Sequence, residues 1–156
     1  MLKIFYRFTI ITFLLFNNVS AESFLNYNIT GNDRISTQTI INFSNLKTGV
    51  DFSENELNQA LKEIYNTNFF ELVNLKISNN TLYINVKELP IIQDIEFKGI
   101  KAKKYITILT DQMSLKSRSS FNEFFLKNDL NKITNILRQS GYYYSNVDVQ
   151  KIVNSN

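Results

Sequence analysis

The sequence repeats itself at an offset of 68 to 69 residues, and this self-similarity limits the possible folds more than any single motif does. Gly99 follows Gly31 by 68 residues, and Phe121 follows Phe52 by 69. Further pairs at the offset of 69 are Leu46 with Leu115, Leu57 with Leu126, Leu61 with Leu130, and Ile64 with Ile133. Such a coherent offset indicates a tandem repeat of one supersecondary unit.

The first copy ends in a pattern typical of a β-hairpin. Apolar and polar residues alternate on both sides of Asn79-Asn80, and the apolar positions are Val73, Leu75, Ile77, Leu82, Ile84 and Val86. Two central Asn residues suit a tight hairpin turn, because Asn tolerates the positive φ that such turns need. The pattern predicts two strands with one buried face.

The residues before the hairpin predict a strand and two helices. Alternating Tyr27 and Ile29 indicate a strand that ends at Gly31, and Ser36 is placed to cap a short helix. Ser53 and Glu56 form a capping box ahead of an amphipathic helix. The first unit is therefore expected to be β-α-α-β-β, a two-layer α+β domain with a small mixed sheet covered by two helices.

The second copy begins near Ile91 but stops before its last strand. It has apolar positions for two strands, Ile95 with Phe97 and Val147 with Val149, and Asn122 as a helix cap. No counterpart of the hairpin's second strand follows before Asn156. The three inward side chains of such a strand would contribute about 5–9 kcal/mol, against about 5–15 kcal/mol of net stability for a small domain. We therefore expect an incomplete, marginally stable second unit, in the front end of a longer protein or a truncated product.

The N-terminus predicts a cleaved signal peptide. Lys3 and Arg7 precede an apolar run of about nine residues, which is too short to span a bilayer as a helix. Val19 and Ala21 give the small-residue pattern of a cleavage site, so we expect cleavage between Ala21 and Glu22. The expected organisation is a signal peptide in residues 1–21, a first unit in 22–89 and a second in 90–156, all exported.

Composition excludes several kinds of chemistry. The chain has no Cys and no His, which excludes a Cys nucleophile, a His general base and the common zinc ligand sets, so we expect no enzyme and no cofactor. Asp94 and Glu96 share one strand face, but a solvated face is favoured over a catalytic carboxylate pair. The net charge of +3 includes Lys3 and Arg7, and without these two residues the chain has 15 basic and 14 acidic residues. Because the remaining net charge is close to zero, no nucleic-acid partner is expected.

Four segments, in the same order along the chain, resemble polypeptide-transport-associated (POTRA) domains. The resemblance is to the first two of the consecutive POTRA domains found in outer-membrane protein assembly factors. The four segments are NITGNDRISTQTI (28–40), LKTGVDFSENELNQALKEIYNTNFFELV (46–73), LYINVKELPIIQDIEFKG (82–99) and SGYYYSNV (140–147). Two positions depart from the family pattern: Ile100 replaces an Asn, and Arg118 stands where a turn Gly is expected.

This resemblance implies a function in protein assembly at the periplasmic face of the bacterial outer membrane. Such domains receive unfolded outer-membrane proteins, work with accessory lipoproteins, and connect to the membrane through a C-terminal β-barrel that this chain does not contain. The family fold places the third strand in the middle of the sheet and the second at its edge.

An edge strand offers unpaired backbone groups to an extended peptide, which is β-augmentation. We therefore predict a binding edge formed by Glu71, Leu72, Val73, Asn74, Leu75, Lys76 and Ile77, although an edge that Lys76 merely protects is an equally good interpretation. Glu88, Leu89 and Pro90 are the expected joint between the units, because Pro fixes its own φ and favours an extended residue before it.

Two other classes of protein remain as alternatives. One is the same type of segment in a two-partner secretion or autotransporter assembly transporter, which only the sequence of a downstream barrel would distinguish. The other is a cell-division scaffold of the FtsQ type, which has one such domain behind an uncleaved membrane anchor. The short apolar run and the internal repeat both disfavour the scaffold.

Overall fold

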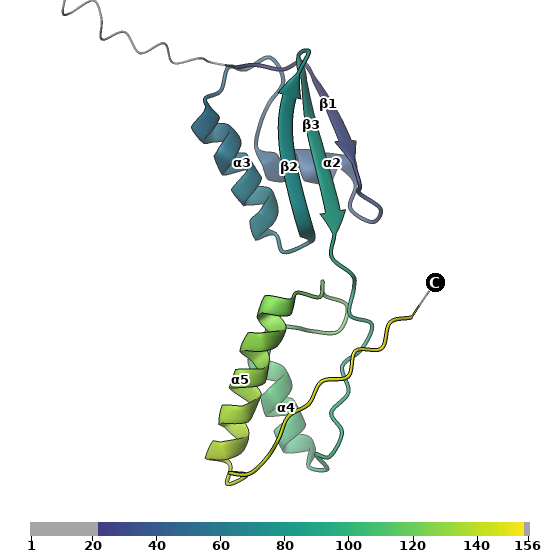
Figure 1. Ribbon diagram of the computed structural model, residues 1–156, viewed down its shortest axis with the longest axis vertical. Helices are drawn as coiled ribbons and strands as arrows, with labels where there is room; N and C mark the ends of the chain where they lie inside the picture. The colour runs from purple at the N-terminus through teal and green to yellow at the C-terminus, as the bar shows by residue number, and fades with distance from the viewer. Residues whose placement is uncertain (1–21, 155–156) are drawn as a thin grey trace, which may run out of the picture. The chain divides into compact units, whose positions relative to one another are not determined.

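The computed structural model describes residues 22–154 of the chain (Figure 1). The elements in chain order are β1 (Asn26–Thr30), α2 (Thr37–Ser44), α3 (Glu54–Asn66), β2 (Phe70–Ser78), β3 (Thr81–Glu88), α4 (Lys103–Gln112) and α5 (Glu123–Gln139). The described residues form two compact units, one made of residues 22–66 and 73–86 and the other of residues 67–72 and 87–154, so the ends of β2 and β3 contribute to the second unit while the rest of the sheet belongs to the first. The α+β class and the β-α-α-β-β order expected from the sequence are confirmed.

A three-stranded mixed sheet in the order β1-β3-β2 forms one layer of the first unit. β1 runs parallel to β3, from the pair Asn26 and Thr81 to the pair Thr30 and Asn85. The inward side chains of β3, namely Leu82, Ile84 and Val86, are 0–3% exposed. Helices α2 and α3 lie on the same face of the sheet (Figure 1), so these side chains form the middle of the core.

Local sequence signals set the boundaries of the helices as expected. Ser36 accepts a hydrogen bond from the Thr39 N–H at 3.2 Å at the start of α2. At the start of α3 the Ser53 N–H donates to the Glu56 carboxylate at 2.7 Å, and the Glu56 N–H donates to the Ser53 hydroxyl at 3.3 Å. The hydrogen bond from the Ser53 N–H, and a second one that the Ser53 hydroxyl donates to the same carboxylate at 2.9 Å, hold the pKa of Glu56 below its usual value.

Gly31 follows β1 directly and lies close against the backbone of β3. Its φ is +83°, and a Cβ atom at this position would lie 1.9 Å from the carbonyl oxygen of Val86. A side chain is therefore excluded both by the backbone conformation and by the neighbouring strand. Only glycine allows the chain to turn away from β1 while β3 continues beside it.

Residues 90–154 contain the helices α4 and α5 of the second unit but no strand. Leu109 and Met113 from the α4 side pack with Ile133 and Leu137 of α5, and partly buried residues close over this cluster: Ile95, Phe97, Ile100, Ile136 and Val147. The segments expected as strands at Ile95–Phe97 and Val147–Val149 are not assigned to strands. The physical reason is that in the order β1-β3-β2 the outer strands pair only with the central one, and residues 90–154 include no central strand.

Arg118 occupies the turn position where the family pattern has a Gly. Its φ is +67°, close to the +71° of Gly49, which precedes it by 69 residues. The similarity between the two units therefore includes the backbone conformation at this turn. Because Arg118 has a side chain, its left-handed conformation costs about 1 kcal/mol.

A buried carboxylate holds the second unit together. Asp129 on α5 is 0% exposed, and its oxygens accept hydrogen bonds from the backbone N–H groups of Ser114 and Leu115 at 2.8–2.9 Å. Lys132 lies 3.3 Å from the same carboxylate and also donates to the Gln112 carbonyl at the end of α4. Burial alone would raise the pKa of Asp129, but the N–H donors and Lys132 outweigh it and lower the pKa.

We expect Asp129→Asn to destabilise the second unit by about 1–3 kcal/mol at neutral pH, because charge-assisted hydrogen bonds to two backbone donors are weakened. The contribution of a carboxyl whose folded pKa is lowered is present above its unfolded pKa of about 3.9 and is lost as the pH falls through the folded value. Urea unfolding at pH 7 and at pH 3 therefore should show a large difference between wild type and variant at pH 7 and a smaller one at pH 3.

The matched control is Asp111→Asn, at an exposed carboxylate on α4. Its effect should stay within about 0.5 kcal/mol at both pH values. Equal losses for the two variants at pH 7 would contradict the structural role of Asp129.

Candidate peptide-binding edge

The nine-residue strand β2 forms one edge of the sheet, next to the central β3. The strand contains all seven residues of the predicted binding edge, from Glu71 to Ile77. Val73 is buried and Leu75 and Ile77 are half-buried, whereas Asn74 and Lys76 are exposed. The inward and outward faces expected from the sequence are thus present over this part of the strand.

The turn at Asn79-Asn80 determines which backbone groups point to the free edge. Both residues have positive φ, 48° and 57°, as in the two-residue turns whose twist matches that of a hairpin. Such a turn pairs Ser78 with Thr81, so alternate residues of β2 direct their N–H and C=O groups toward β3. The groups of the residues in between, Val73, Leu75 and Ile77, point away from β3 to the free edge.

The start of β2, at the end away from the Asn79-Asn80 turn, contains an irregularity in strand pairing that the sequence pattern did not predict. The Leu89 N–H donates to the Phe69 carbonyl at 2.8 Å, and Lys87 forms a 2.8 Å ion pair with Glu71. Both pairs are shifted by one residue from the register that the turn sets. One extra residue must therefore lie in β2, and Leu72 fills that position, which is a β-bulge.

The burial pattern supports this assignment. Phe70 and Val73 are 2% and 7% exposed, although they are three residues apart, while Glu71 and Leu72 between them are exposed. A regular strand alternates with a period of two and cannot bury both. The spacing of three between two apolar residues was the signal in the sequence that could have revealed the bulge.

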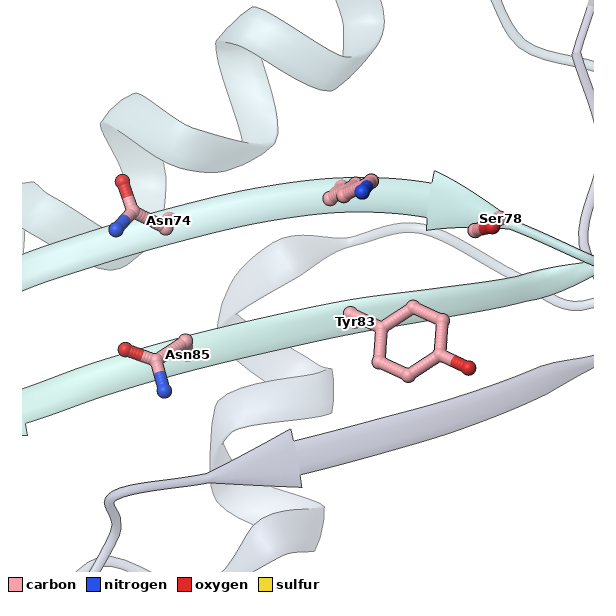
Figure 2. Close-up of a pocket in the computed structure, with 5 residues that line it drawn as sticks. Asn74, Ser78, Tyr83 and Asn85 are labelled. Carbon is pink, nitrogen blue, oxygen red and sulfur yellow. The ribbon is translucent and has the colours of Figure 1, made fainter.

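The outward face beside the edge is a polar, open hollow. It is lined by Asn74, Lys76, Ser78, Tyr83 and Asn85. Figure 2 shows Asn74 and Ser78 on one strand and Tyr83 and Asn85 on the neighbouring strand, all on the same face. Asn85 donates to the Thr30 hydroxyl at 2.9 Å, which links β3 to β1 across this face.

The other residues singled out in the sequence lie apart from this edge. Glu88 ends β3, and the Pro90 carbonyl accepts a hydrogen bond from the Phe121 N–H at 2.7 Å. Glu22 pairs with Phe52 through two backbone hydrogen bonds, whereas Ala21 and the rest of the expected signal peptide lie outside the described residues. Asp94 accepts hydrogen bonds from the Ile95 N–H and the Ser117 hydroxyl, so its carboxylate links this segment to the turn at Ser117.

The described part of the chain offers no cluster of three or more acidic, His or Cys side chains for a metal ion. None of its helices combines the length and apolar character needed to cross a bilayer. The described residues form a small α+β unit with a free strand edge, followed by a second unit with two helices of its own.

The chain belongs to the POTRA family, described as the surface antigen variable number repeat, because this family matches residues 24–89 and again residues 90–156. A curated relative is the outer membrane protein assembly factor BamA of Neorickettsia risticii (strain Illinois), 28% identical over 81 residues. The match covers 52% of this chain and 11% of that protein, so the chain spans about a tenth of its relative.

Two solved structures share the fold at low sequence identity. The N-terminal domain of Omp85 from Thermosynechococcus elongatus is 16% identical, with a TM-score of 0.54, over 80% of this chain and 54% of that one. POTRA domains 1–2 of the periplasmic domain of Omp85 from Anabaena are 13% identical, with a TM-score of 0.52, over 88% and 91%. These structures confirm the fold, and the family match over both units confirms the family expected from the sequence.

Deleting Leu72 should be tolerated, because it removes the bulged residue and leaves Glu71 opposite Lys87. We expect a loss of less than about 1 kcal/mol in urea unfolding. Deleting Leu75 instead moves every residue before it to the opposite face and should cost more than about 3 kcal/mol. Similar losses for the two deletions would show that the bulge is not at Leu72.

Proposed function

We propose that this chain is the periplasmic POTRA segment of an outer-membrane β-barrel assembly factor, and that it binds unfolded outer-membrane proteins along the free edge of β2. The family membership and the BamA and Omp85 relatives support the first part. The single observation that carries the second part is the position of β2 at the edge of the sheet, with the backbone groups of Val73, Leu75 and Ile77 directed outward.

The strands of outer-membrane barrels are suitable ligands for such an edge. They alternate apolar and polar side chains with a period of two, as β2 itself does. A client strand paired with β2 would place one set of side chains on the inward, apolar face and the other beside Asn74, Lys76 and Ser78. Because main-chain pairing hardly depends on client sequence, many different clients can use the same edge.

Simple energetics favour weak, reversible binding at this edge. Three outward residues provide about six backbone hydrogen bonds, each with a net contribution of about 0.5–1.5 kcal/mol. The sum of about 3–9 kcal/mol is comparable to the cost of association, about 4–15 kcal/mol. A segment that passes clients onward needs such short-lived complexes, and the bulge at Leu72 keeps the pairing short by interrupting the edge.

The proposed setting follows from the family. We infer an exported segment at the periplasmic face of the outer membrane, with accessory lipoproteins as partners and a C-terminal barrel, outside this chain, as its membrane attachment. It acts without catalysis, cofactor or nucleic acid. The polar hollow at Lys76 and Tyr83 then serves as a surface for client side chains rather than as a substrate pocket.

Leu75→Pro should weaken crosslinking of an unfolded outer-membrane protein to β2 by at least fivefold, because it removes an outward N–H donor. The matched control is Leu75→Ala, which loses the same half-buried side chain but keeps the donor, and which should retain crosslinking. Site-specific photo-crosslinking from Lys76, with circular dichroism to confirm folding, measures both. Equal crosslinking by two folded variants would reject the edge as the binding site.

We further propose that Glu88, Leu89 and Pro90 act as the joint between the two units. The fixed φ of Pro90 and its effect on Leu89 restrict the directions in which the chain leaves β3. Pro90→Ala should broaden the distribution of orientations between the units, measured by residual dipolar couplings. An unchanged distribution in the variant would reject Pro90 as the restricting residue.

A further inference from the structure

Five exposed basic residues gather at one end of the second unit, and we call them the basic end. Four lie in or just before the first turn of α4 and one in the last turn of α5, namely Lys98, Lys101, Lys103, Lys104 and Arg138. The ring of Tyr105 on α4 lies 5.9 Å from that of Tyr142, which follows α5, so the start of one helix adjoins the end of the other. Figure 1 shows the start of α4 and the end of α5 at the same end of the unit.

The basic end carries positive charge without compensation. No Asp or Glu occurs in residues 97–110 or 130–147. Within residues 22–154, none of the five basic residues forms an ion pair. Residues 22–156 have 15 basic and 14 acidic residues, so the part outside the basic end has 10 basic and 14 acidic residues. The positive charge is therefore concentrated on one end of a protein that is otherwise net negative.

The fold does not require these lysines. The equivalent residues of the first unit, 68 positions earlier, are Thr30, Asp33, Ile35 and Ser36. Ser36 caps α2, whereas α4 begins after Ala102 with no side-chain cap and has Lys103 and Lys104 in its first turn. Cations are unfavourable at the positive N-terminal end of a helix. The lysines therefore cost stability, and the reason for their presence lies outside the folding of the unit.

We propose that the basic end docks on the surface of a bilayer that contains anionic phospholipid. Charge complementarity supports this docking, since each Lys or Arg held near such a surface raises the affinity about fivefold. Four of the five are Lys, a flexible point charge that suits a fluid layer of phosphates, whereas a structured site for a single anion favours the planar fork of Arg. The ring of Tyr142, 52% exposed, has the apolar body and polar tip typical of side chains at a membrane surface.

The contact is limited to the basic end by the charges around it. The nearest acidic residues along the chain are Glu96, Asp111 and Asp148, all exposed, and they lie beyond the basic end. An anionic surface repels these carboxylates, so it orients the second unit with the start of α4 and the end of α5 toward the phosphates. This docking depends on charge alone and is independent of the proposed function.

The absence of Cys allows a single fluorescent label to report on the contact. In the full chain, Ala102→Cys carries the environment-sensitive dye nitrobenzoxadiazole within the basic end, and Thr110→Cys carries it about two turns further along α4. Vesicles of equal parts phosphatidylcholine and phosphatidylglycerol should raise the fluorescence at position 102 at least twofold and leave position 110 nearly unchanged. The rise should disappear in about 1 M salt, where the Debye length is about 3 Å.

Three results of this labelling experiment would overturn the proposal. They are no rise at position 102 with anionic vesicles, equal rises at both positions, and an equally large rise with vesicles of phosphatidylcholine alone.

A matched pair of triple variants locates the site. Lys101→Glu, Lys103→Glu and Lys104→Glu together should lower the affinity for anionic vesicles at least thirtyfold, and α4 should be retained because acidic residues suit a helix N-terminus. The control makes the same change in net charge at exposed lysines elsewhere and should stay within threefold: Lys47→Glu, Lys62→Glu and Lys127→Glu. Titration of the label at position 102 measures both. Equal losses would show that net charge alone determines binding and would overturn the site.

Two further outcomes separate this surface from other partners. Tighter binding of soluble polyglutamate than of vesicles, at the same concentration of anionic groups, would assign the basic end to an acidic polypeptide and overturn the lipid surface. Leu75→Pro, at the β2 edge, should leave vesicle binding unchanged, and loss of vesicle binding in this folded variant would contradict docking by the basic end. The basic end and the β2 edge can therefore fail independently of one another.

Discussion

The central strand is the constraint on which the rest of this fold depends. β3 pairs with a strand on each side and buries Leu82, Ile84 and Val86, so it provides the backbone partners of both neighbours as well as the middle of the core. The outer strands of the order β1-β3-β2 have no hydrogen bonds to one another. The first unit has a sheet because this strand is present, and the second has helices and a packed cluster but no strand among residues 90–154.

The helix layers of the two units are stabilised by different interactions. Ala60 of α3 is buried, and the residue 69 positions later is Asp129, whose carboxylate ties α5 to the turn after α4. Ala60 packs as a small apolar side chain, whereas the Asp129 carboxylate, with three donors, connects α5 to the residues after α4. This arrangement explains how the second unit keeps ordered helices around the Leu109 and Ile133 cluster.

Much of the fold could be predicted because its signals are local. Helix caps at Ser36, Ser53 and Asn122, and the Asn79-Asn80 turn, depend on residues close in the sequence, and all four are present in the structure. The bulge at Leu72 and the missing strands at Ile95 and Val147 depend on pairing between distant segments, which alternation alone does not specify. Asp129 was missed because a single acidic residue within an apolar helical stripe gives no indication of the backbone donors that it will meet.

The bulge and the charge of Lys76 limit how a strand can pair with the free edge of β2. At β2, Leu72 interrupts the edge and Lys76 places a charge on its outward face, both of which oppose the uncontrolled pairing that a long flat edge permits. A polypeptide with alternating side chains should therefore pair with β2 only between the bulge and the Asn79-Asn80 turn, over the stretch that contains Val73, Leu75 and Ile77. Such short pairing favours brief contact over the lasting addition of a strand.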